Sequence, residues 1–114
     1  MNISLLVTAT PGPDTDSALS FARAVIAEGH QLYRVFFYGD ATLCGGIDAA
    51  CAPQWQTLAA SSDVDLVLCS TSADKRGLFG NMDAVPETFN GFTVSGLGQL
   101  VDAGIQSDRL VTFN

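Results

Sequence analysis

Apolar residues along the chain fall into short continuous runs separated by amphipathic stretches. We expect four strands, at Ile3 to Thr8, Leu32 to Tyr38, Val64 to Cys69 and Arg109 to Phe113, because these runs are rich in β-branched and aromatic residues. The first three show little polar alternation, which is typical of strands covered on both faces of a parallel sheet.

Helical spacing of apolar residues marks the stretches between these runs. We expect a helix from Asp16 to Glu28, with a cap among Asp14 to Asp16 and a stop at Gly29. Further helices are expected at about Pro53 to Ser61 and Ser95 to Ala103. The alternation predicts a single α/β domain over residues 1–114, a small doubly wound three-layer α/β/α fold with a mainly parallel sheet of four to five strands.

The segment from Gly77 to Phe92 has apolar residues without clear periodicity and predicts a long loop with one helical turn at most. Its apolar members are Leu78, Phe79, Met82, Val85, Phe89 and Phe92. We expect them to be buried against another subunit, the alternative being that the loop folds back over its own sheet.

The charge balance excludes several classes of partner. Five Lys and Arg stand against twelve Asp and Glu, so an acidic surface would repel nucleic acid. No apolar run approaches the ~20 residues of a membrane span. The N-terminal run lacks a basic region and stops at Pro11-Gly12, which indicates a strand rather than a signal peptide. With three cysteines and no export signal, we expect reduced thiols and a cytoplasmic protein.

Reactive groups of open parallel sheets gather at the carboxyl ends of the strands. His30 falls at the opposite edge, so a self-contained Ser-His or Cys-His hydrolase is not expected. No metal site is expected either, because the cysteine spacings lack the C-x2-C pattern. Cys44 and Cys51 lie in or near the loop after the second strand; Cys44 could approach Cys69 as a resolving thiol, but we favour a bystander role.

Cys69 ends the third strand at the functional edge and precedes Ser70, Lys75 and Arg76. A thiol at a helix start with two cations about one turn away has its thiolate favoured. The alternative is that Cys69 is a small buried hydrophobe and the basic pair a solvated surface feature.

Two segments, LVLCSTSADKRGLF and GFTVSGLGQLVDAGIQSDRLVTF, resemble the DsrE/TusD family of sulfur-relay proteins. The opening strand and helix, through ALSFARAVIAEGHQLYRVFFY, are similar as well, whereas the middle, about 41–60, and the loop at 78–90 are the least comparable. The resemblance thus spans most of the chain.

The resemblance implies that Cys69 carries sulfane sulfur as a persulfide, accepting it from an upstream donor protein and passing it to a downstream acceptor. In that family TusD serves tRNA 2-thiouridine synthesis and DsrE serves sulfur oxidation, usually in hetero-hexamers of paralogous subunits, so a homo- or hetero-oligomer is expected. Thiolate exchange requires no cofactor. Lys75, Arg76 and Ser70, the last through backbone donors near it, are the expected stabilisers of the anionic persulfide.

Two other functions remain open. The loop TATPGPDTDS leads into a helix N-terminus, as in a flavodoxin-like small-ligand-binding domain, but Asp14 and Asp16 would oppose a phosphate. A non-catalytic DsrE-like interaction subunit is the other alternative, against which the presence of Cys69 counts.

Overall fold

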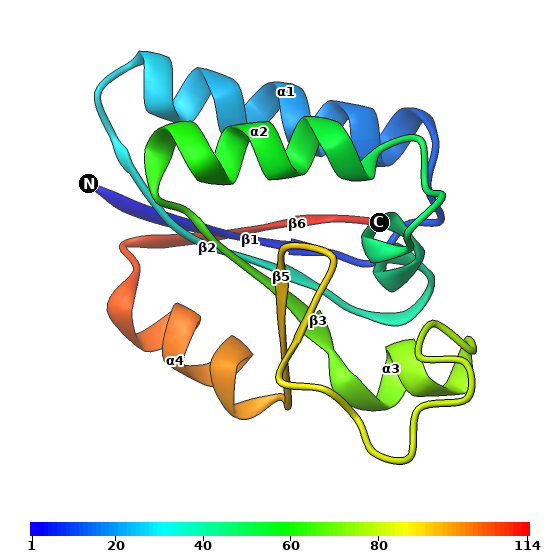
Figure 1. Ribbon diagram of the computed structural model, residues 1–114. Helices are drawn as coiled ribbons and strands as arrows, with labels where there is room; N and C mark the ends of the chain where they lie inside the picture. Colours follow the sequence, from blue (N-terminus) through cyan, green and yellow to red (C-terminus); the bar gives the residue numbers. More distant parts are fainter.

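The computed structural model describes residues 1–114 and shows a six-stranded sheet between two layers of helices (Figure 1). The elements are β1 (Asn2–Val7), α1 (Pro13–Ala27), β2 (Gln31–Phe37), the 3₁₀ helix η1 (Gly39–Gly45), α2 (Ala52–Ser62), β3 (Asp65–Cys69), α3 (Ser70–Lys75), β4 (Thr88–Phe89), β5 (Phe92–Ser95), α4 (Gly98–Gln106) and β6 (Arg109–Phe113). The strand order is β4-β5-β3-β2-β1-β6, parallel throughout except between β4 and β5. The predicted doubly wound α/β/α fold is confirmed, with six strands instead of four to five.

The two additional strands form a hairpin in the region for which we predicted a loop and the start of a helix. Asn90 and Gly91 connect β4 to β5, with φ values of 50° and 83°. Such positive values suit Asn-Gly, the pair preferred in tight two-residue hairpin turns. Because β5 extends to Ser95, α4 begins at Gly98, later than predicted.

The start of α1 also differs from the prediction. Its N-cap is Gly12 and not one of the residues Asp14 to Asp16. The Thr15 hydroxyl accepts a hydrogen bond from the Gly12 N–H at 2.8 Å, and Pro13 takes the first helical position, where its missing N–H costs nothing. The predicted stop at Gly29 is confirmed, with a left-handed φ of 84°. None of the helices has the length and apolar character needed to cross a membrane.

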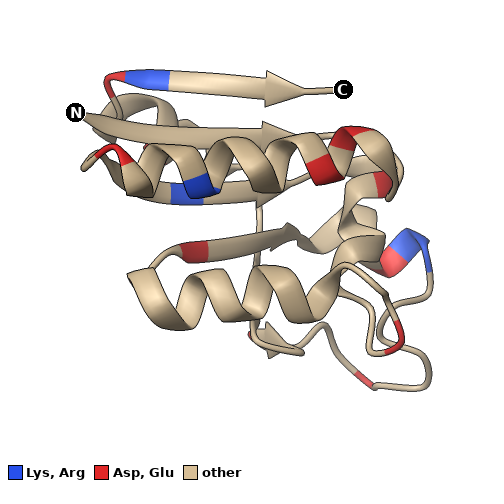
Figure 2. Ribbon diagram, turned by 90° about the horizontal axis from the view of Figure 1, so that it is seen from above, with Lys and Arg blue, Asp and Glu red and all other residues tan.

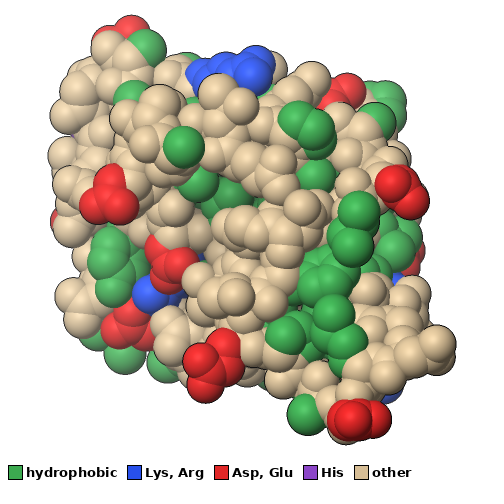
Figure 3. All heavy atoms as spheres, viewed as in Figure 1, with side chains coloured by type: hydrophobic (Ala, Val, Ile, Leu, Met, Phe, Trp, Pro, Cys, Tyr) green, Lys and Arg blue, Asp and Glu red, His purple; other side chains and the backbone are tan.

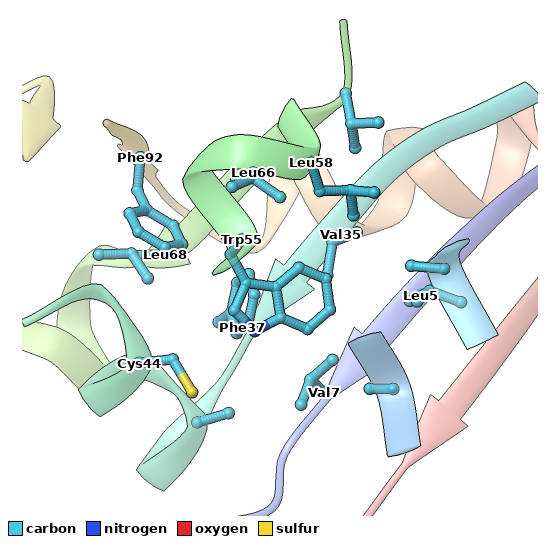
Figure 4. Close-up of a cluster of buried hydrophobic side chains, with 14 of the residues drawn as sticks. Leu5, Val7, Val35, Phe37, Cys44, Trp55, Leu58, Leu66, Leu68 and Phe92 are labelled. Atoms are coloured by element: carbon cyan, nitrogen blue, oxygen red, sulfur yellow. The ribbon is translucent and has the colours of Figure 1, made fainter. Parts of the chain in front are cut away.

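Side chains of the central strands alternate between the two helical layers. Phe37 and Leu68 belong to a core cluster of 23 residues on the α1 and α2 side, where Phe37 meets the edge of the Trp55 ring at a centroid distance of 5.2 Å (Figure 4). Phe36, Val67 and Cys69 form a separate cluster of 3 residues, against which Leu100 of α4 packs. The alternation therefore places the thiol of Cys69 on the α4 side, where the apolar cluster is smaller.

The apolar segment before β5 folds back on its own sheet in part, which corrects the expectation that it is buried against another subunit. Phe79, Phe89 and Phe92 are buried in the main core, and the rings of Phe79 and Phe89 lie 5.4 Å apart. Met82 and Val85 remain 52% and 46% exposed. Apolar side chains gather around this segment, at the lower right of Figure 3.

A charged network holds α4 against the sheet. The guanidinium of Arg34, in β2, donates hydrogen bonds to Asp65 and Asp102 at 2.8 Å each, and to the Gln99 carbonyl at 2.9 Å. Tyr33 donates a hydrogen bond to the same Asp102 carboxylate. The bond from Arg34, which has the larger effect, and the bond from Tyr33 hold the pKa of Asp102 below its usual value. Since Arg34 is itself buried, the network fixes the position of α4 against the start of β3.

Candidate functional site

Cys69 lies at the point where β3 ends and α3 begins. It is the last residue of the strand and the N-cap of the helix, and it pairs with Ser95 of β5 at the carboxyl edge of the sheet. A cavity of about 340 Å³ opens at this edge. It is lined by Tyr38, Gly39, Cys69, Thr71, Ser72, Lys75, Arg76, Gly96 and Leu97. Cys69 is only 3% exposed, so its thiol is recessed within the cavity.

The two cations predicted near Cys69 both line its cavity, but only one of them is paired with a carboxylate. Nε and Nη2 of Arg76 each lie 2.9 Å from the same oxygen of Asp40, and its Nη1 donates to the Ser72 carbonyl at 3.0 Å. The bond from Arg76, followed by one from Thr10, holds the pKa of Asp40 below its usual value. Lys75 takes part in none of the three ion pairs. Lys75 is therefore the uncompensated positive charge at this cavity.

Ser70 does not line the Cys69 cavity. It faces a neighbouring hollow with Thr71, Asp74, Lys75 and Val85. The hydroxyl-bearing residues that do line the cavity with Cys69 are Tyr38, Thr71 and Ser72, and our sequence reasoning did not single out Tyr38. Its position directly after β2, at the same sheet edge, was the available signal.

Cys44 and Cys51 lie on the other side of the sheet from Cys69. Cys44, in η1, is fully buried in the main core (Figure 4), and Cys51 is the half-buried N-cap of α2. The alternative that Cys44 approaches Cys69 as a resolving thiol is not supported, because the two side chains belong to separate clusters. Instead Cys44 and Cys51 act on each other: the Cys51 thiol, together with burial, raises the pKa of Cys44, and the Cys44 thiol lowers the pKa of Cys51.

Other groups considered from the sequence lie away from these sites. His30 is exposed at the opposite sheet edge, with its Nδ1 3.2 Å from the N-terminal amine. No group of three or more His, Cys, Asp or Glu side chains is placed to hold a metal ion. Basic residues are few and scattered over the ribbon, whereas acidic ones are more numerous (Figure 2).

These features define a class of small α/β proteins in which a recessed cysteine ends a central parallel strand beside a cation. Comparison with known proteins identifies the family. The chain belongs to the DsrE/DsrF-like family, which it matches over residues 1–113.

Individual relatives agree with this assignment. DsrE of Allochromatium vinosum is 38% identical over 87% of this chain and 86% of its own length. Sulfurtransferase TusD of an Enterobacter species is 35% identical over 99% of this chain and 100% of its own length. Among solved structures, the ychN protein of E. coli superposes with a TM-score of 0.77 at 21% identity, covering 99% of both chains. The protein MTH1491 of Methanobacterium thermoautotrophicum superposes with a TM-score of 0.76 at 18% identity, covering 96% of this chain and 97% of its own. The two structures establish the fold.

Proposed function

We propose that this protein is a sulfurtransferase that carries sulfane sulfur as a persulfide on Cys69. The observation that supports the proposal most strongly is the recessed position of this thiol in a cavity that also contains an uncompensated cation, Lys75. The relatives named sulfurtransferase TusD agree with transfer of sulfur. The proposal places the reaction in the cytoplasm, where thiols stay reduced.

The proposed reaction is a pair of thiolate exchanges. The Cys69 thiolate attacks the outer sulfur of a donor persulfide, the donor S–S bond breaks, and the donor leaves as a thiolate. An acceptor thiolate then attacks the outer sulfur on Cys69, which leaves as a thiolate in turn. No net oxidation occurs and no cofactor is required, so the protein has only to bind, stabilise and protect the intermediate.

The cavity provides the groups that this intermediate requires. A persulfide bound to Cys69 is anionic near neutral pH, and the ammonium of Lys75 is the free charge available to it. Thr71 and Tyr38 line the same space, and both side chains carry a hydroxyl that can donate a hydrogen bond. Arg76 mainly holds the residues of the cavity wall in position, because its guanidinium is already paired with Asp40. At Ser70 only the backbone N–H, at the start of α3, is given a role, as a hydrogen-bond donor to the persulfide.

Partner proteins must bring their own thiols to this recess. We expect an upstream donor and a downstream acceptor, with homo- or hetero-oligomers of DsrE-like subunits. Exposed apolar side chains near the cavity suit such contacts: Leu97 on its wall is 51% exposed, and Val85 lies in the adjacent hollow. The same step at Cys69 serves either tRNA 2-thiouridine synthesis or a sulfur oxidation relay. Sedimentation of the chain should detect association, and replacing Leu97 with Lys should weaken it.

Incubation with glutathione persulfide followed by intact-mass analysis tests the proposal. The protein should gain one sulfur atom, and Cys69→Ser should not. The matched control is Cys51→Ser, which removes a half-buried thiol elsewhere and should retain the sulfur. A Cys69→Ser protein that is folded by circular dichroism and still gains the full sulfur load would contradict the assignment.

A further inference from the structure

The Cys44 and Cys51 pair has no part in the reaction proposed for Cys69, yet each thiol is the main influence on the pKa of the other. Cys44 is the next-to-last residue of η1 and Cys51 is the N-cap of α2, and a compact turn joins these elements. Three backbone hydrogen bonds fix that turn, from the amides of Gly46, Ala49 and Ala52 to carbonyls three residues earlier. The turn therefore holds the two cysteines near each other in the local fold, and a disulfide at this position would close a short loop.

The two thiols differ in access. Cys44 is fully buried, whereas Cys51 lines a cavity of about 420 Å³ at the start of α1 and α2. The other lining residues are Pro11, Gly12, Asp16, Leu43, Ala49, Ala50 and Gln54. A reagent from solvent thus reaches Cys51 first, and Cys44 can react only with a group already placed on Cys51.

The thiol contact also decides which cysteine ionises first. The hydrogen bond from Cys44 lowers the pKa of Cys51, while the same contact, together with burial, raises the pKa of Cys44. The more accessible thiol is consequently the better nucleophile. This division between an attacking and a resolving cysteine is typical of redox-active pairs.

The charge of the cavity limits the kind of oxidant that can enter. Asp16 is the one charged side chain in its lining, and it opposes ionisation of both thiols. With a formal net charge of -7 on the protein, an anionic oxidant is repelled. The cavity therefore favours a small uncharged oxidant such as a hydroperoxide.

We propose that Cys51 and Cys44 form a second thiol site, a redox pair that closes to a disulfide on reaction with hydrogen peroxide. The Cys51 thiolate attacks one peroxide oxygen, the O–O bond breaks, and the released hydroxide takes a proton to become water. Cys51 is then a sulfenic acid. Cys44 attacks its sulfur, the S–O bond breaks, and the hydroxide leaves with the Cys44 proton as a second water. Two thiols are oxidised to one disulfide, and one peroxide is reduced to two waters.

The test uses hydrogen peroxide and the Cys69→Ser protein, in which only this pair of thiols remains, so its result does not depend on the function proposed for Cys69. We expect loss of both titratable thiols, an intact mass lower by two hydrogen atoms, and full reversal by dithiothreitol. With Cys44→Ser added, Cys51 should stop at a sulfenic acid that dimedone traps. With Cys51→Ser added, Cys44 should stay reduced.

Wild-type protein provides an independent readout if a variant folds poorly. Trypsin leaves all three cysteines in one fragment, because no Lys or Arg lies between Arg34 and Lys75. Chymotryptic cleavage after Trp55 separates Cys69 from the pair, and the linked fragment should contain Cys44 and Cys51. Persistence of both thiols, over-oxidation of Cys51 without a disulfide, or a link between two chains would each overturn the proposal.

Discussion

The two cysteine sites lie at the same edge of one sheet but on opposite faces, and their surroundings differ in charge. Cys69 has no thiol partner and shares its cavity with Lys75. Cys51 has the Cys44 thiol as its partner and shares its cavity with the carboxylate of Asp16. A nearby cation suits a thiol that must hold an anionic persulfide, whereas a partner thiol suits one that forms a disulfide. The fold thus keeps the two thiol sites apart on opposite faces of one sheet.

The faces differ in packing as well. The α1 and α2 side contains the 23-residue core, and the α4 side contains a cluster of 3, supplemented by the network around Arg34. The Cys69 site is therefore built on the side with the smaller apolar cluster.

The largest expected effect concerns this asymmetry in packing. Trp55→Ala removes a fully buried indole from the main core and should lower the free energy of unfolding by about 3–5 kcal/mol. Leu100→Ala, on the partly exposed α4 side, is the matched change and should cost less than half as much. Urea unfolding followed by circular dichroism measures both. Equal losses would show that the two faces contribute alike to stability.

The next effect concerns the charge at Cys69. Lys75→Gln removes the uncompensated ammonium and its attraction for negative charge in the cavity, so alkylation of Cys69 by iodoacetamide near neutral pH should slow roughly threefold. Arg76→Gln serves as the control, with a smaller effect because Asp40 already occupies that guanidinium. An equal or larger effect at Arg76 would reverse the roles assigned to the two cations.

A smaller change is expected at Asp40. Its pKa is lowered, so the carboxylate stays ionised and paired with Arg76 as pH falls through the usual carboxyl range, and the pairing is lost only below it. Asp40→Asn frees the Arg76 charge and should raise the alkylation rate of Cys69 by about twofold or less. The rate should return to that of the unmodified protein when Arg76→Gln is added. Failure of the second change to reverse the first would mean that Arg76 does not act on the thiol.

Much of the fold could be predicted because the apolar runs of buried parallel strands are distinctive. The prediction for Arg109 to Phe113 matched β6 fully, and the first three strands were placed within one residue at each end. The β4 and β5 hairpin was missed because its strands are short, although the Asn90-Gly91 turn was a usable signal. The Phe residues before β5 looked unpartnered because their partners are distant in sequence, which periodicity cannot reveal.

The candidate site was predictable in its residues but not in its electrostatics. The strand-end position of Cys69 and the nearby basic pair could be recognised from their order along the chain. The Arg76–Asp40 ion pair joins residues 36 positions apart, so its neutralising effect on Arg76 could not be recognised from the sequence. The contact between Cys44 and Cys51 depends on the turn between η1 and α2, which carries no strong sequence signal.

The most direct test of the central claim is to locate added sulfur in the wild-type protein, with all three thiols competing. After brief exposure to limiting glutathione persulfide, alkylation of the free and persulfidated thiols and chymotryptic cleavage after Trp55 separate Cys69 from the other two. The account predicts that the added sulfur is found on the Cys69 fragment, with the Cys44 and Cys51 fragment unmodified or linked as a disulfide. Sulfur retained mainly on the Cys51 fragment would contradict it.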